Sequence, residues 1–383
     1  MSRRYPLARV GIIGGGQLAR MMLPAAAQLG CEVVVLDPTP ASPAGQLASK
    51  EIVGGFDDPQ ALRELAQQCS VTTFDIETIA TNPLRELAAE GHAIVPAPEL
   101  LATIQDKLLQ KRLLATAGIP TADFVELHDP DPQRMIGFGL PLVQKAQRGG
   151  YDGRGVAVFT DVIVEERVLQ VPSLLERFVD FRCELAVMVA RSHAGETRAF
   201  PVVEMVFDHR ANVLDFLVAP ARIDPELALS AQQLAERTVT AMRGVGVFGV
   251  ELFLTRSGEL LVNEVAPRTH NSGHWTIEAC RTSQFEQHLR AILGLPLGDP
   301  TQHSPAVMLN LLGEPGAAGA VLIEGLDAAL ALPGVSVHLY GKQSVRPYRK
   351  MGHVTVTAPD LETALAIAQE VKGLLRITGT EQS

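Results

Sequence analysis

The sequence predicts a protein of mixed α/β and α+β class in three parts: a Rossmann-like N-terminal domain, a central pair of α+β halves and a small β-rich C-terminal domain. Residues 9–37 have strand, glycine-turn, helix and strand character, the pattern of a βαβ unit. Residues 250–265 contain two apolar runs separated by a turn segment, and residues 335–357 alternate as strands before a helical segment. We place the domains at residues 1–100, 101–297 and 298–383.

Composition excludes several classes of protein. The chain has 383 residues, 46% of them hydrophobic, which is enough to bury the cores of two or three domains. Its formal net charge of −10 argues against nucleic acid or an anionic membrane as a general partner. The four cysteines lack CxxC spacing, which favours reduced thiols in a cytoplasmic protein. Glycines and Arg20 interrupt the apolar run near the start, so we expect neither export nor a membrane span.

The first unit contains a fingerprint that suits more than one ligand. The pattern predicts strands at Arg9–Ile13 and Glu32–Asp37 with a helix at Leu18–Leu29 between them. The turn GGGQLA at 14–19 has G-x-G-x-x-A spacing, and Asp37 follows at the distance typical of a dinucleotide site. An NAD-dependent dehydrogenase is therefore one hypothesis. The same glycines and helix N-terminus also suit other anions, so the fingerprint alone does not decide the ligand.

The central region begins with a helical pattern and continues with a glycine-rich loop. Residues 99–117 predict one helix, ended by Gly118-Ile119-Pro120. Strands predicted at 140–146 and 156–159 flank the segment RGGYDGRG, whose four glycines allow its backbone to fold over phosphates. Lys145 just before it would neutralise phosphate charge. A plain flexible hairpin is the alternative.

The two runs at 250–265 predict a β-hairpin that opposes two carboxylates. If Ser257-Gly258 is a two-residue loop, Glu251 and Glu264 face each other directly. Like charges about 5 Å apart destabilise a sheet, and a hard divalent cation between them, Mg²⁺ or Mn²⁺, is the simplest reason to tolerate the pair. A solvated sheet face carrying both glutamates is the alternative. The polar loop that follows, which contains Arg268 and His270, favours a site.

A family resemblance rests on this same region. The segment NEVAPRTHNSGHWTIEACRTSQFEQHLRAILGLPLG at 263–298 resembles the signature of 5-(carboxyamino)imidazole ribonucleotide synthase, the ATPase component of phosphoribosylaminoimidazole carboxylase, in the ATP-grasp superfamily. The resemblance extends from GGGQLARM near the start to RKMGH near the end. It implies an ATP-grasp central domain whose flap-bearing half covers about residues 120–180.

The resemblance also implies an activity and a set of site residues. The activity is ATP- and bicarbonate-dependent N-carboxylation of 5-aminoimidazole ribonucleotide through carboxyphosphate, in purine biosynthesis, by a homodimer with Mg²⁺ on Glu251 and Glu264. The implied catalytic residues are Tyr151, Asp152, Arg268, His270 and Asn271. The implied ATP-binding residues are Lys107, Lys145, Glu176, Phe178, Val179 and Glu184. The implied substrate-binding residues are Gln17, Glu77, Arg154, Lys342, Arg349 and Lys350.

Some positions depart from the family pattern, and two further functions stay open. The departures are Ala19, Asp75, Thr78, Ala186 and Met205. One alternative is a formate-using ATP-grasp relative acting on glycinamide ribonucleotide, although HNSGHW favours the carboxylating family. The other is a non-catalytic ATP-binding module, which would need a defective metal pair, whereas Glu251 and Glu264 are both present. The C-terminal cations would ordinarily be solvated; in this context they resemble a phosphate clamp.

Overall fold

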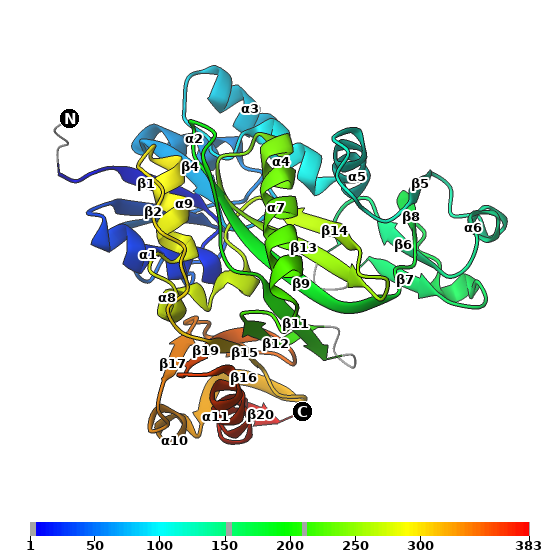
Figure 1. Cartoon of the computed structure of the whole chain (residues 1–383). Coiled ribbons are helices and arrows are strands. Elements are labelled where there is room, and N and C mark those ends of the chain that lie inside the picture. The colour runs from blue at the N-terminus through cyan, green and yellow to red at the C-terminus, as the bar shows by residue number, and fades with distance from the viewer. Residues whose placement is uncertain (1–4, 151–154, 209–212, 383) are drawn as a thin grey trace.

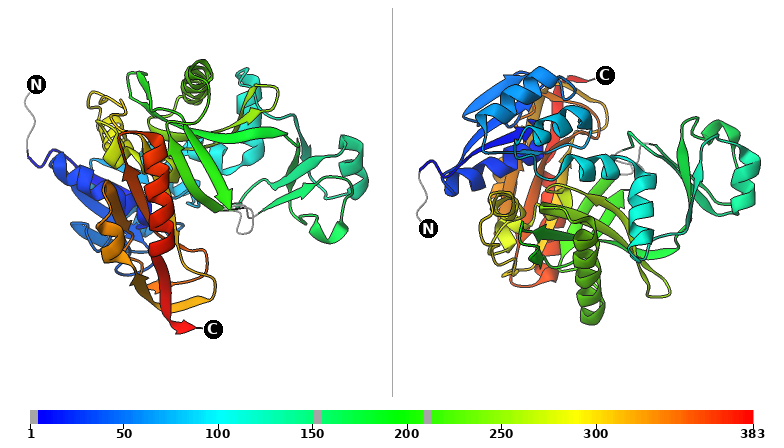
Figure 2. Two further views of the ribbon diagram at one scale, coloured as in Figure 1. Left: turned by 60° about the horizontal axis from the view of Figure 1, so that its bottom comes forward. Right: turned by 90° about the horizontal axis from the view of Figure 1, so that it is seen from above.

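The computed structural model describes residues 5–150, 155–208 and 213–382. Figure 1 shows the N-terminal part and a small lobe on opposite sides of a large central sheet, with the C-terminal part packed below that sheet. Figure 2 shows that the lobe, which carries β5 to β8, projects away from the rest of the molecule. Among the described residues, no helix has the length and apolar character needed to cross a bilayer.

The N-terminal part confirms the predicted βαβ unit. Four described strands pair in parallel in the order β3-β2-β1-β4. The strands are β1 (Arg9–Ile13), β2 (Glu32–Asp37), β3 (Lys50–Val53) and β4 (Val71–Phe74). The helices are α1 (Gln17–Gln28), α2 (Pro59–Gln68) and α3 (Thr81–Ala89). Strand β1 is buried on both faces after Arg9, as expected for the centre of a parallel sheet.

The prediction of a single helix at 99–117 is wrong in one respect. The structure has two helices, α4 (Pro98–Gln105) and α5 (Lys107–Thr116), with an extended residue, Asp106, between them. The Asp106 carboxylate accepts hydrogen bonds from the amides of Leu108 and Leu109, so it caps a new helix. The break places Lys107 at the first position of α5, where it faces the central sheet.

The lobe is an antiparallel sheet covered by a short helix. Its described strands run in the order β5-β8-β6-β7, and β6 pairs with β7 as a hairpin, as predicted. The elements are β5 (Phe124–Leu127), α6 (Pro132–Phe138), β6 (Leu142–Ala146), β7 (Val156–Phe159), η1 (Glu165–Arg167) and β8 (Ser173–Arg177). Three residues predicted to act from the flap, Tyr151, Asp152 and Arg154, lie outside the described residues.

The central sheet contains nine of the described strands and continues into the C-terminal part. Its order is β14-β13-β9-β11-β12-β15-β19-β17, with β10 beside β9. The strands are β9 (Phe181–Arg191), β10 (Thr197–Ala199), β11 (Val203–Asp208), β12 (Val213–Ala219), β13 (Gly246–Thr255), β14 (Leu260–Ala266), β15 (Ala306–Leu312), β17 (Val335–Leu339) and β19 (Lys350–Thr357). The sequence pattern did not predict β15, or β16 (Ala317–Glu324), which follows it.

Helices and a small second sheet complete the chain. Three described strands, β16 (Ala317–Glu324), β18 (Ser344–Val345) and β20 (Arg376–Gln382), pair in the order β18-β16-β20. The remaining helices are α7 (Pro225–Met242), η2 (Asn271–Gly273), α8 (Thr276–Ala279), α9 (Gln284–Ile292), α10 (Leu326–Leu330) and α11 (Leu361–Leu374). Asp224 caps the start of α7, and Arg243 ends this helix in the left-handed conformation.

Candidate active site

The predicted opposition of Glu251 and Glu264 is confirmed, although the hairpin reaches it differently. Leu254 pairs with Leu260, and the Thr255 amide donates to the Glu259 carbonyl at 2.9 Å, so the loop has three residues, 256–258, with Gly258 at a φ of 89°. The register then shifts between Glu251 and Leu252, because Asn263 is an extra residue on β14. The longer loop and the bulge offset each other, and the two carboxylates still face each other across the strands.

The bulge also aims a side chain that the sequence did not single out. Val262 on one side of it lies in the core, whereas the Asn263 amide oxygen accepts a hydrogen bond from Lys145 Nζ at 2.9 Å. Lys145 comes from the lobe and Asn263 from the central sheet. The pair therefore joins the lobe to the central sheet.

The two opposed carboxylates have opposite electrostatic surroundings. Burial, followed by the charge of Glu264, raises the pKa of Glu251 to about 8. Lys107 forms an ion pair with Glu264, and its charge lowers the pKa of that carboxyl to about 2. The pair thus favours one negative charge at neutral pH unless a cation joins it.

The donor set fits a hard divalent ion that also takes phosphate ligands. Two carboxylates supply hard oxygen ligands, and Mg²⁺ is usually held by one or two carboxylates together with substrate phosphates and water. Within the described ranges, no group of three or more His, Cys, Asp or Glu residues could hold a metal ion.

A buried network of alternating charges lies beside this pair. Glu176, which is 2% exposed, contacts Lys145 Nζ at 3.0 Å and Lys111 Nζ at 3.4 Å. Burial alone would raise the pKa of Glu176, but the two lysines hold it below its ordinary value. Burial lowers the pKa of Lys111 to about 8 despite Glu176. Lys111 was not singled out from the sequence, because a lysine one helical turn after Lys107 carries no special pattern.

The remaining predicted ATP-binding residues lie around this network. Phe178 and Val179 are half-buried just beyond the end of β8, where the chain passes from the lobe into β9. Glu184 lies on β9 opposite Phe253 of β13. Burial raises the pKa of Glu184 to about 7; the charge of Lys145 lowers this pKa and the charge of Glu264 raises it. Because Phe253 is two residues from Glu251 on β13, Glu184 lies on the same face of the sheet as Glu251.

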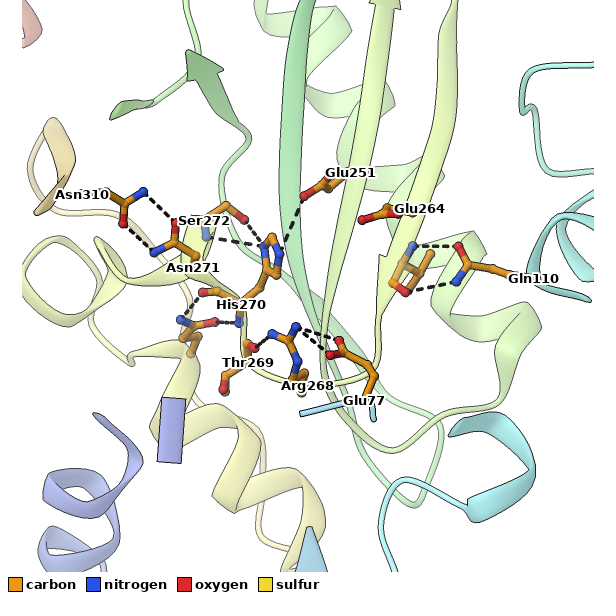
Figure 3. A network of polar contacts seen from close by, with 12 residues as sticks. Glu77, Gln110, Glu251, Glu264, Arg268, Thr269, His270, Asn271, Ser272 and Asn310 are labelled. Atoms are coloured by element: carbon orange, nitrogen blue, oxygen red, sulfur yellow. Dashed lines mark hydrogen bonds and ion pairs between the residues drawn. The ribbon is translucent and has the colours of Figure 1, made fainter. Parts of the chain in front are cut away.

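The 268–274 loop leaves β14 directly after the carboxylates, as Figure 3 shows. Arg268 forms an ion pair with Glu77 at 2.7 Å, which brings a residue from beyond β4 of the N-terminal part into the site. His270 Nε2 lies 3.7 Å from Glu251, and His270 Nδ1 lies 2.9 Å from the Ser272 hydroxyl. The loop therefore presents a guanidinium and an imidazole beside the carboxylate pair.

Two glutamine side chains hold the backbone of this region, and neither was predicted. The Gln284 amide accepts from His270 N at 2.9 Å and donates to His270 O at 2.7 Å. The Gln110 amide bonds both backbone groups of Val265 in the same way, at 2.9 and 3.2 Å. Each glutamine satisfies one N–H and one C=O, so Gln284 fixes the loop backbone at His270 and Gln110 satisfies the backbone groups of Val265 on the edge strand β14.

The glycine turn after β1 is occupied by the protein's own carboxylates. Asp37 accepts from Gly15 N at 2.8 Å, and buried Asp75 accepts from Ala19 N at 3.2 Å. A Cβ at Gly14 would lie 1.8 Å from Asp75 Oδ1, so the glycine permits this close approach. Ala19 and Asp75, two departures from the family pattern, thus contact each other.

We therefore expect no specific binding of NAD(H) or NADP(H). The amide that would face a pyrophosphate already bonds Asp75, and Asp37 bonds the turn instead of remaining available for a ribose. Calorimetric titration with each nicotinamide nucleotide should give no saturable heat. Saturable binding at micromolar concentration would restore the dehydrogenase hypothesis.

Cations of the C-terminal part meet the start of α1. Lys342 Nζ donates to Gln17 Oε1 at 2.9 Å and to the Lys350 carbonyl at 2.5 Å. Burial, and then the charges of Arg349 and Lys350, lower the pKa of Lys342 to about 7. Positive groups that are crowded and partly desolvated in this way form a site suited to an anion.

Family comparisons agree with this arrangement. Residues 7–105 match the ribonucleotide synthetase preATP-grasp domain, and residues 112–285 match the ATP-grasp domain. Residues 306–367 match the phosphoribosylaminoimidazole carboxylase C-terminal domain.

Individual proteins are similar over nearly the whole chain. N5-carboxyaminoimidazole ribonucleotide synthase of Brucella melitensis is 39% identical over 362 residues, which cover 92% of this chain and 97% of that protein. The crystal structure of the Thermotoga maritima synthetase is 47% identical, with a TM-score of 0.90 and coverage of 97% and 99%. The Aspergillus clavatus synthase in complex with ADP and 5-aminoimidazole ribonucleotide is 36% identical, with a TM-score of 0.86 and coverage of 96% and 98%. The chain therefore belongs to the N5-carboxyaminoimidazole ribonucleotide synthase family of ATP-grasp enzymes.

Proposed function

We propose that this chain carboxylates 5-aminoimidazole ribonucleotide on its amine with ATP and bicarbonate, through carboxyphosphate, in purine biosynthesis. One observation carries the proposal. Strand β14 bears Glu264, which pairs with Lys107, and leads directly into the loop with Arg268 and His270. We assign the ATP phosphates to the first pair and bicarbonate to the loop, so the two reactants would lie next to each other. Family membership supports the same reaction.

In the first step, a bicarbonate oxygen attacks the γ-phosphorus of ATP, the bond from that phosphorus to ADP breaks, and carboxyphosphate forms. Lys107, at the start of α5, and Lys145, on β6 of the lobe, neutralise phosphate charge. Mg²⁺ or Mn²⁺, when held by Glu251 and Glu264, supplies further charge neutralisation. Arg268, fixed by Glu77, holds the bicarbonate with His270.

In the second step, the amine of the nucleotide attacks the carboxyl carbon of carboxyphosphate. The bond from this carbon to the phosphate oxygen breaks, inorganic phosphate leaves and the amine loses a proton. We assign orientation of the amine to His270 and Asn271. Because carboxyphosphate hydrolyses readily, the proposal includes a flap that excludes water, to which Tyr151, Asp152 and Arg154 belong by resemblance.

The 5′-phosphate of the nucleotide is assigned to Lys342, Arg349 and Lys350, beside Gln17. An arginine can bind a phosphate through two parallel hydrogen bonds, and the lysines add point charges. Burial, and then the charges of Arg349 and Lys350, lower the pKa of Lys342. These neighbouring cations support the assignment, because a bound anion offsets the repulsion among them. The adenine and ribose of ATP are assigned to Glu176, Phe178, Val179 and Glu184.

The pH dependence of nucleotide capture tests the Lys342 assignment. The pKa of Lys342 is lowered to about 7, so in the free enzyme its ammonium is charged below that pH and increasingly neutral above it. We expect kcat/KM for the nucleotide to fall by up to about tenfold per pH unit above neutrality, because this ratio reports groups of the free enzyme. Lys342→Arg should remove most of this decline, since a guanidinium stays protonated. Identical profiles for the two proteins would contradict the assignment.

A homodimer and a cytoplasmic location are further parts of the proposal. The first rests on family resemblance, and the second on cysteines that lack CxxC spacing. Light scattering after gel filtration tests the first, and fractionation of the producing cell tests the second. A formate-using relative acting on glycinamide ribonucleotide is the competing activity.

The function is tested by measuring ADP release with each substrate omitted in turn. We expect release to require bicarbonate and to rise when 5-aminoimidazole ribonucleotide is added, because that nucleotide completes the closed pocket. Replacing bicarbonate and this nucleotide with formate and glycinamide ribonucleotide should abolish release. Formate-driven turnover would overturn the proposal.

A further inference from the structure

A row of polar side chains crosses the C-terminal end of the central sheet. In the register of the strands, Asn310 of β15 is opposite His353 of β19, and His353 is opposite His338 of β17. Directly opposed residues on adjacent strands share one face of a sheet. We call Asn310, His353 and His338 the polar row.

Each member of the polar row contacts one residue of the segment that follows the metal-site strand. Asn310 and Asn271 exchange two amide hydrogen bonds of 2.9 Å each. His353 stacks on His274, with ring centroids 4.6 Å apart. His338 Nε2 lies 2.6 Å from Glu278 Oε1. Asn271, His274 and Glu278 are three and four positions apart, the spacing that places residues on one side of a helical segment.

The contacts are buried and continuous. His353 also stacks on His338 at 4.5 Å, and neither His274 nor His353 is exposed. Burial lowers the pKa of both His274 and His353 well below its ordinary value, which favours the neutral form of these two rings. Fixed partners at three successive positions leave the segment little freedom to move relative to the sheet.

The first contact lies next to the proposed bicarbonate residue. Asn271 follows His270 directly, and Asn310 Nδ2 also donates to the Leu214 carbonyl at 2.8 Å, which anchors it to β12. Figure 3 shows the Asn271–Asn310 pair on one side of His270, while Gln284 holds the backbone of His270 from α9. The loop is thus fixed from two sides by residues distant in sequence.

We propose that Asn310, supported by His353 and His338, is a positioning residue that sets the 268–274 loop for bicarbonate and the incoming amine. The C-terminal part then serves the carboxylation chemistry as well as substrate-phosphate binding. This inference rests on the proposed function, because the loop matters only if it handles bicarbonate.

A second set of contacts extends the polar row toward the phosphate cations. The Tyr340 hydroxyl lies 3.0 Å from His353 Nδ1, and Lys342 Nζ lies 5.6 Å from the centre of the Tyr340 ring. Strand β19 begins at Lys350 and reaches His353 three residues later. Strand β19 therefore carries both Lys350, which we assign to the nucleotide phosphate, and His353, which packs against the segment after β14.

The test compares Asn310→Ala and Asn310→Asp with the wild-type full chain. Asn310→Ala removes both hydrogen bonds to Asn271. Asn310→Asp keeps the shape but places an acceptor against the Asn271 and Leu214 oxygens. Thr355→Val is the matched control, since this buried residue lies two positions along β19 from His353 and its hydroxyl has no hydrogen-bond partner among the described residues. Each protein is assayed for KM of bicarbonate, ATP and nucleotide, for the ratio of ADP released to nucleotide carboxylated, and for thermal unfolding.

We expect both Asn310 variants to raise KM for bicarbonate about tenfold, equivalent to about 1.4 kcal/mol, and to release ADP in excess of product. KM for ATP should stay within about twofold of wild type, and Thr355→Val should match wild type in every assay. Unchanged bicarbonate KM and coupling in both variants would overturn the proposal, as would equal losses for all three substrates with a lower unfolding temperature. Wild-type turnover that ignores bicarbonate would instead overturn the proposed function, and this inference with it.

Discussion

Glu264→Gln is expected to reduce Mg²⁺-dependent turnover roughly a hundredfold to a thousandfold, the loss typical when one preorganised electrostatic group is removed from an active site. The amide keeps the size of the side chain but removes the charge that pairs with Lys107 and opposes Glu251. The metal then has one anionic ligand in place of two, so the charge on the transferring phosphoryl group is less neutralised. ADP release measured across a series of Mg²⁺ concentrations shows the effect.

Glu259→Gln is the control for that substitution. Glu259 lies on the same hairpin and is exposed. Its replacement by glutamine also exchanges a carboxylate for an amide of the same size. It should leave turnover and Mg²⁺ dependence unchanged. Circular dichroism should show that both variants fold, and near-normal activity of Glu264→Gln at ordinary Mg²⁺ would contradict the metal assignment.

Arg349→Ala is expected to weaken binding of the nucleotide substrate by tenfold to a hundredfold, which corresponds to about 1.5–3 kcal/mol for one lost charge-assisted contact. Arg349 is half-buried, and its Nη1 donates to the Ser344 carbonyl at 2.7 Å, which orients the guanidinium beside Lys342. Steady-state KM for 5-aminoimidazole ribonucleotide measures the loss, and KM for ATP should change little.

The matched control is Arg376→Ala. Arg376 is another arginine of the C-terminal part, exposed and paired with Glu324 on the small sheet. Its removal should leave both KM values unchanged, since exposed ion pairs contribute little. A defect of Arg349→Ala confined to ATP would show that the substrate phosphate has been placed wrongly.

Local patterns predicted the elements that depend on neighbouring residues. The βαβ unit and the two strands on either side of the glycine-rich segment of the lobe follow from hydrophobic periodicity and glycine positions. The opposition of Glu251 and Glu264 was also predicted, but through a two-residue loop that the structure replaces with a three-residue loop and a bulge. The bulge directs the Asn263 side chain to Lys145 of the lobe. The sequence of one strand does not reveal a partner that distant.

Contacts between distant segments account for what the sequence did not predict. Gln284 and Gln110 hold backbone groups that the fold brings to them, and Asn310 bonds a residue 39 positions away. Helix α5 begins at Lys107 because Asp106 caps it, whereas the apolar spacing continues through the break. Periodicity is insensitive to such polar pairs, since they add no apolar residue to the pattern.

In the proposed reaction, a bicarbonate oxygen attacks ATP, and carboxyphosphate then carboxylates the amine. The direct measurement uses bicarbonate labelled with ¹⁸O, together with ATP and 5-aminoimidazole ribonucleotide, over the first turnovers, followed by ³¹P NMR of the inorganic phosphate. The attacking oxygen stays on phosphorus when the carbon–oxygen bond breaks, so the account predicts one ¹⁸O atom in each phosphate formed. Unlabelled phosphate released together with carboxylated nucleotide would contradict it.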